Sequence, residues 1–319
     1  MPRVTQTNKI GLSLGPQESF LVTVDGPPNR QKVTNLFDID LGAPFIFEAV
    51  SEIDILETIG QNLKDTLLAE GITSDDIYIS LDYSMAMIKN LPVDDTLKES
   101  ELKEHVLWEM EQHVISPIPD YSFDFQKISK AFSSHYPSVL LVTVKKQIID
   151  AVKTIAETAD LNLNLIDINV FSVVNALEKN YSLKSNEKVV SVGIGQESLL
   201  FTILKGTNFL GFHPVQLEKE DDLSNISLEN IYSEITKNLR FFISDYETED
   251  GKKEFDRIFV YKIDKTIDIN ELLSVETDSP FEILNPLKKM SILPKLKDRM
   301  DPLSDYSEFT TSVGLVVRD

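Results

Sequence analysis

Residues 11–18 of the chain read GLSLGPQE, and residues 193–197 read GIGQE. Each stretch is a glycine turn between two runs of residues typical of β-strands. Phosphate-binding proteins place glycine turns in this position, because a residue without a side chain lets backbone N–H groups approach a ligand closely. Two strand–turn–strand units about 180 residues apart indicate a duplicated architecture.

The composition limits the class of protein. The chain has 319 residues, 42% of them hydrophobic, which is enough for two lobes with a full core. Its 52 acidic and 31 basic residues leave a net charge of −21, so we expect no binding to nucleic acid or anionic lipid. The absence of cysteine excludes disulfides, thiolate catalysis and sulfur-ligated metals.

No stretch of the sequence predicts a membrane span. No apolar run approaches the roughly 20 residues that a transmembrane helix needs. Residues 1–8 also lack the apolar core of a signal peptide. The sequence therefore predicts a cytoplasmic protein that does not insert directly into the membrane.

The spacing of apolar residues predicts hairpins alternating with amphipathic helices, in an α/β or α+β class with mixed sheets. A capping box at Thr96–Glu99 is expected to open a helix that extends to Val114. Other helices are expected at 53–69, 148–159, 171–177 and 228–246. Strands are expected at 9–25, 28–48, 77–81, 85–88, 121–129, 138–145, 188–205, 209–212 and 258–261.

Four segments carry a family resemblance through their order along the chain. They read EMEQHVISPI (109–118), VLLVTV (139–144), LIDINVFS (165–172) and VGLVVR (313–318). With the opening hairpin, they resemble the type IV pilus assembly protein PilM family, actin-like relatives of the cell-division protein FtsA. In that family a helix ends in a segment like EAEKYIPFP, and the chain closes near GLALR. The resemblance covers nearly the whole length.

The resemblance implies an α/β fold of the actin-like (ribonuclease H-like) type, with two lobes around a cleft and an α+β subdomain inserted in the first lobe. On this basis we expect the first lobe at residues 1–85 and 166–187, the insert at 86–165 and the second lobe at 188–319. Family members lie at the cytoplasmic face of the inner membrane and bind the N-terminal tail of a bitopic partner, PilN. Several also bind ATP.

Residue by residue, the ATP pocket of the family is altered in this chain. In the first hairpin, Ser13 replaces the family's aspartate, Pro16, Gln17 and Glu18 stand where the family shows serines, and Phe20 replaces a lysine. A glutamate about 4 Å from a phosphate oxygen costs on the order of 4 kcal/mol at near-surface screening. The altered positions of both hairpins are Ser13, Gly15, Gln17, Glu18, Gly193, Gly195, Gln196 and Glu197.

The nucleobase end of that pocket is altered as well. The family has a Ser-Gly-Gly turn after a late strand, whereas residues 260–265 contain no glycine. We therefore expect a pseudo-ATPase with no catalytic residue and no cofactor, in which Glu18 and Glu197 face an empty or water-filled cleft. A remodelled site that still binds ATP and Mg²⁺ is the alternative.

The helix at 99–114 supplies the expected partner site. The only tryptophan, Trp108, lies on it, and Val114, Pro117 and Ile118 follow as candidate walls of a peptide groove. Packing of Trp108 into the core of the insert is the alternative. His105, Glu109 and His113 share one helical face, but metal sites want other spacings and further ligands, so we expect no metal there.

Together these features predict a cytoplasmic actin-like scaffold of a type IV pilus or related secretion machine. It would bind the basic cytoplasmic tail of a PilN-like inner-membrane protein without hydrolysing ATP, and it would be able to form homo-oligomers. One alternative is a PilM-type ATPase with an altered pocket. Another is an L-type type II secretion component, in which we would expect a transmembrane segment to follow Arg318 and Asp319.

Overall fold

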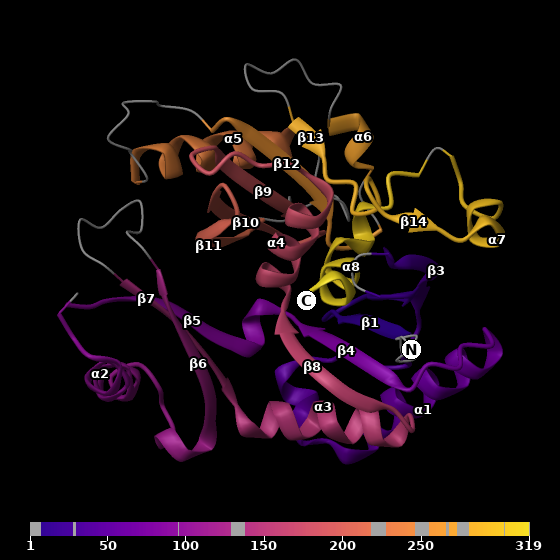
Figure 1. Cartoon of the computed structure of the whole chain (residues 1–319), viewed down its shortest axis with the longest axis horizontal. Coiled ribbons are helices and arrows are strands. Elements are labelled where there is room, and N and C mark those ends of the chain that lie inside the picture. The colour runs from indigo at the N-terminus through magenta and orange to yellow at the C-terminus, as the bar shows by residue number, and fades with distance from the viewer. Residues whose placement is uncertain are drawn as a thin grey trace, which may run out of the picture.

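The computed structural model describes residues 8–27, 30–94, 96–128, 138–217, 228–245, 255–265, 268–272, 281–302 and 304–318. Two lobes lie one above the other, and a smaller third unit projects from the first (Figure 1). Among the helices of the described residues, none combines the length and the apolar character needed to cross a membrane.

The first lobe is built on a six-stranded sheet in the order β14-β3-β2-β1-β4-β8. β1 to β3 form an antiparallel meander, and β4 and β8 continue the sheet parallel to β1. Two helices, α1 (Ile53–Ala69) and α3 (Lys146–Thr158), pack on one face, and α8 (Thr310–Val317) packs on the other. The strands are β1 (Lys9–Leu14), β2 (Ser19–Asp25), β3 (Lys32–Ile39), β4 (Asp76–Leu81), β8 (Asn162–Ile168) and β14 (Ser291–Ile292).

The second lobe begins with the same kind of antiparallel hairpin as the first. Its five-stranded sheet has the order β11-β10-β9-β12-β13, and β9 and β10 form an antiparallel hairpin like that of β1 and β2. Helices α5 (Leu228–Asp245) and α6 (Ile269–Leu272) pack with this sheet. The strands are β9 (Lys188–Ile194), β10 (Ser198–Lys205), β11 (Asn208–Gln216), β12 (Arg257–Lys262) and β13 (Phe281–Ile283).

The insert is a three-stranded sheet covered by helix α2 (Glu99–Glu111). Its strands, in the order β5-β7-β6, are β5 (Ala86–Pro92), β6 (Tyr121–Ile128) and β7 (Ser138–Lys145). The expected insert extended to residue 165, but α3 packs against α1 and β8 pairs with β4, so both lie with the first lobe. From the expected second lobe, β14 and α8 likewise lie against the first sheet.

The predicted start of α2 was wrong by a few residues. The hydroxyl and the backbone N–H of Thr96 both donate to Asp94, so Thr96 caps nothing. The helix begins at Glu99 instead, and the backbone N–H of Lys98 donates to the carboxylate of Glu101. Asp94 captures Thr96 because a short acidic side chain readily bonds the backbone two residues on.

A pair of helices joins the lobes. Helix α4 (Asn169–Asn180) lies in the middle of the molecule beside α8 (Figure 1). One continuous core cluster contains residues of α4, the first sheet and the second sheet, among them Val173, Leu12 and Phe259. A Cβ on Gly314 of α8 would lie 1.8 Å from the carbonyl oxygen of Ser172, so only glycine permits this approach.

We expect Gly314→Ala to lower the free energy of unfolding by about 3 kcal/mol, because the added methyl group forces α4 and α8 apart in a close-packed core. Gly71→Ala is the matched control: at Gly71 φ is +67° and no atom lies within 4 Å of an added Cβ. The control should lose only about 1 kcal/mol from the left-handed backbone. Urea denaturation measures both, and equal losses would contradict the packing role of Gly314.

Candidate functional site

A cavity of about 240 Å³, here called the cleft, lies between the turns of the two hairpins. It is lined by seven of the eight positions that the sequence singled out: Ser13, Gly15, Gln17, Glu18, Gly195, Gln196 and Glu197. The eighth position, Gly193, lies within β9 and does not line the cleft. The fold therefore brings the two glycine turns together, as the duplicated hairpins predicted.

Two of the glycines have packing reasons that involve no ligand. A Cβ on Gly15 would lie 2.2 Å from the carbonyl oxygen of Glu18, so glycine is needed to close that turn. A Cβ on Gly193 would lie 2.6 Å from the ring of Tyr261, which is buried beside it on β12. Burial, followed by the charge of Asp82, raises the pKa of the Tyr261 hydroxyl. This phenol stays protonated.

Backbone donors that a phosphate would need already have partners within the chain. The N–H of Gly195 donates to the carbonyl oxygen of Ser198 at 2.9 Å and closes the second turn. The N–H of Gln196 donates to a carboxylate oxygen of Asp264 at 2.7 Å. A carboxylate of the protein thus occupies the position in which an anionic ligand would accept this bond.

The charges that line the cleft are mostly negative. Its acidic residues are Glu18, Asp82, Glu197, Asp264 and Glu308, and Lys262 is the one basic residue among the described residues that line it. A triphosphate would enter a field of its own sign, at a cost on the order of 4 kcal/mol for each carboxylate that it approaches within about 4 Å. We therefore expect this lining to disfavour ATP.

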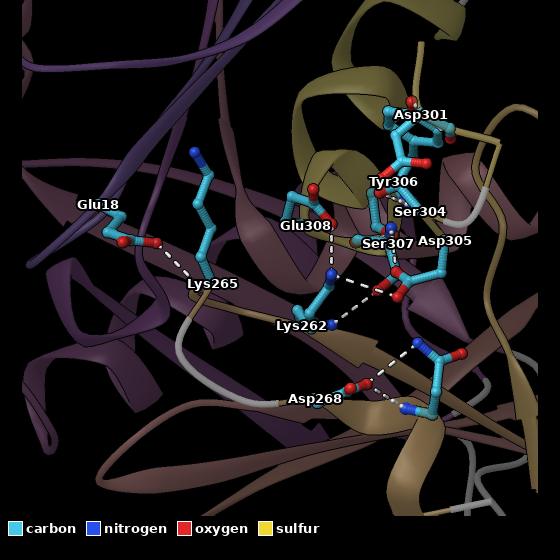
Figure 2. Close-up of polar contacts among 12 residues, drawn as sticks. Glu18, Lys262, Lys265, Asp268, Asp301, Ser304, Asp305, Tyr306, Ser307 and Glu308 are labelled. Carbon is cyan, nitrogen blue, oxygen red and sulfur yellow. Dashed lines mark hydrogen bonds and ion pairs between the residues drawn. The ribbon is translucent and has the colours of Figure 1, made fainter.

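Lys262 is itself neutralised. Its ammonium nitrogen lies 3.1 Å from Glu308 and 3.2 Å from Asp305, which come from the segment leading into α8 (Figure 2). Burial alone would lower the pKa of Lys262, but the two carboxylates raise it above its ordinary value. The lysine therefore stays charged and joins β12 to the C-terminal segment.

Sequence reasoning did not single out several residues of the cleft, including Asp82, Asn169 and Asp264. One signal was available for Asp82, which directly follows the buried run Ile77–Leu81. Parallel strands such as β1 and β4 bring their carboxyl ends to the same edge of a sheet, which is where open α/β sheets place polar site residues. The amide of Asn169 donates to Asp82 at 3.0 Å.

A second hollow, here called the groove, has a volume of about 550 Å³ and lies between the insert and the first lobe. Strands β6 and β8 both line it, and in the described residues each pairs with a single neighbouring strand. Helix α4, the β10–β11 turn and Arg318 complete its wall. Its apolar lining includes Phe125, Ile128, Val142, Leu165, Phe171 and Phe209.

Among the described residues, the charged ones that line the groove are three acids and one arginine. Asp124 and Glu178 are exposed on its walls. Asp167 is buried, and Arg318 lies 3.1 Å from its carboxylate. Burial raises the pKa of Asp167, and the opposing effects of Arg318 and of hydrogen bonds from Ile168 and Ser172 do not fully offset it.

The four residues predicted to form a partner groove lie elsewhere on the insert. Trp108 is 57% exposed and stacks on His105, so the alternative that it packs into the core of the insert is wrong. Val114 and Ile118 pack against the core of the insert, and Pro117 precedes a short 3-10 helix. None of the four lines the groove.

Within the helical face that carries His105, Glu109 and His113, the ring of His105 lies 4.0 Å from the carboxylate of Glu109. Across the part of the chain that the structure describes, no group of three or more histidine, aspartate or glutamate side chains has the arrangement of a metal site.

The family is decided by the sequence comparison. The model of the family described as type IV pilus assembly protein PilM matches residues 35–212, more than half of the chain. This chain belongs to the PilM family. The matched region runs from β3 of the first lobe through the insert to β11 of the second. No curated protein matches the sequence.

A solved structure agrees with the expected fold of a PilM-family chain. The structure titled "PilM-PilN type IV pilus biogenesis complex" has a TM-score of 0.73 and 18% identity, and the match covers 99% of this chain and 98% of that one. The cytoplasmic domain of EpsL from the type II secretion system of Vibrio cholerae has a TM-score of 0.48 and 10% identity, with 96% and 98% covered. The predicted actin-like fold is confirmed.

We expect Arg318→Ala to destabilise the protein by about 1 kcal/mol near pH 7, since it leaves the buried carboxylate of Asp167 without its cation. Because the folded pKa of Asp167 is raised, its carboxylate destabilises the folded state above that pKa, and this penalty disappears as the pH falls toward the unfolded pKa. The loss caused by Arg318→Ala should therefore shrink toward about pH 4. Urea denaturation across this range measures it, and a loss independent of pH would refute the assignment.

Proposed function

We propose that this PilM-family chain is an actin-like scaffold of a type IV pilus machine, which binds the cytoplasmic tail of a PilN-like inner-membrane partner and does not hydrolyse ATP. The observation that carries the proposal is the contrast between the two hollows. In the cleft, backbone donors bond to the chain's own carboxylates. The groove, by contrast, offers an apolar lining between two edge strands.

The shape of the groove supports binding of an extended peptide. A strand at the edge of a sheet has backbone groups that can pair with an added strand, and apolar pockets beside it accept alternate side chains. The acidic residues Asp124 and Glu178 favour a basic tail through charge complementarity. The similar solved structure is a complex with PilN, which favours the same class of partner.

The proposal places the protein at the cytoplasmic face of the inner membrane, held there by its partner rather than by lipid. The net charge of −21 supports this arrangement, because anionic headgroups repel such a surface. Self-association remains a prediction, which analytical ultracentrifugation tests. The surface around Trp108, Val114, Pro117 and Ile118 also remains a predicted contact site for the tail.

We expect Mg-ATP to produce no binding heat at micromolar concentrations in isothermal titration calorimetry. The physical reason is the like charge of Glu18, Glu197 and the other carboxylates that line the cleft. A PilM-family protein with an intact pocket serves as the positive control. Saturable micromolar binding by this chain would favour the alternative of an ATPase with an altered pocket.

We expect a synthetic N-terminal peptide of a PilN-like protein to bind, and Glu178→Lys to weaken its affinity by about tenfold, because the substitution reverses an exposed charge beside a basic tail. Glu57→Lys is the matched control, since Glu57 is an exposed acid on α1 and does not line the groove. Fluorescence anisotropy measures both affinities.

The same titration separates the two candidate surfaces. If Trp108→Ala lowers the affinity for the peptide and Glu178→Lys leaves that affinity unchanged, the tail binds at the predicted surface on α2 and not in the groove. If the peptide fails to bind the unmodified chain at high concentration, the partner proposal is wrong.

A further inference from the structure

Lys265 lies just after β12 in the second lobe, and two residues of the first lobe hold it. Its backbone N–H donates to a carboxylate oxygen of Glu18 at 2.9 Å, and Figure 2 shows the side chain of Glu18 directed at this backbone. Its ammonium group forms an ion pair with Asp38 of β3. One residue is thus bound from two elements on the opposite side of the cleft.

These contacts continue into the second hairpin. Asp264, the neighbour of Lys265, accepts the hydrogen bond from the backbone N–H of Gln196. The β1–β2 turn is therefore linked through Glu18 to the end of β12, and the end of β12 is linked through Asp264 to the β9–β10 turn. Together the bonds join the two glycine turns across the cleft.

The chemistry of these bonds matches that of a bound anion. A phosphate between two glycine turns accepts backbone N–H bonds from both sides and so ties them together. Here Glu18 and Asp264 supply the accepting oxygens, and both belong to the chain itself. Lys265 supplies a positive charge between the lobes, with Asp38 as its partner.

We propose that Glu18, Asp38 and Lys265 form a clasp that closes the mouth of the cleft and links the lobes in place of a nucleotide. This inference concerns the state of the cleft and does not depend on the partner or on the groove. A closed cleft without a ligand gives the scaffold one fixed arrangement of its two hairpin turns.

The clasp controls local opening and not folding. The side chains of Lys265 and Asp38 are 39% and 62% exposed, and ion pairs of this kind contribute little to global stability. The shared core of α4 and both sheets carries the folding energy. The clasp acts on the exposed turns at the mouth, which are the segments that open locally in native proteins.

Hydrogen–deuterium exchange of the nucleotide-free chain tests the clasp through the amide of Lys265. Glu18→Ala removes the charged acceptor of that amide, and we expect its exchange to become about tenfold faster. Asp38→Asn, which only loosens the side chain of Lys265, should accelerate the exchange by about threefold. Glu57→Gln is the control, since it removes the same charge from an exposed site of the first lobe.

The expected result is faster exchange in residues 262–265 and in the turn 15–18 for both clasp variants, with the thermal midpoint and the control unchanged. If Glu18→Ala lowers the thermal midpoint, Glu18→Gln is measured instead. It keeps an accepting oxygen and should show intermediate protection.

Two results would overturn the proposal. One is wild-type exchange at Lys265 in the Glu18 variants. The other is an amide of Lys265 that becomes protected in the unmodified chain only after Mg-ATP is added.

Discussion

The rest of the structure depends on the close contact between α4 and α8. Gly314 lies against the carbonyl oxygen of Ser172, and Gly11 lies against that of Ser312, so that α8 fits between α4 and the first sheet. Both contacts are shorter than any side chain would permit. Because α4 also belongs to the core shared with the second sheet, this contact positions the two lobes and, through them, the two glycine turns.

The same pair of helices reaches both hollows. Asn169 of α4 and Thr311 of α8 line the cleft, while Phe171 of α4 and Arg318, just beyond α8, line the groove. The two sites are therefore built on one rigid element, although their chemistry differs. The cleft has an acidic lining whose carboxylates accept hydrogen bonds from the chain's own backbone. The groove has an apolar lining and ends at an ion pair.

The glycines of the two hairpins have structural reasons that do not involve a ligand. Glycine is needed at Gly15 to close the first hairpin turn and at Gly193 of β9 to make room for the ring of Tyr261, whether or not a phosphate binds. The residues beside them meet no such requirement. Glu18 and Asp264 accept hydrogen bonds from the backbone N–H groups of Lys265 and Gln196.

The sequence by itself determined the α/β class, the family, the two hairpins and seven of the residues that line the cleft, because glycine turns and apolar periodicity are local signals. Only the tertiary structure decided that α3, β8 and α8 lie with the first lobe, and that a groove lies between the insert and that lobe. Glu18 and Lys265 are far apart in the chain, as are Asp167 and Arg318. Pairs of this kind depend on how distant elements of the chain pack, and no local pattern records that.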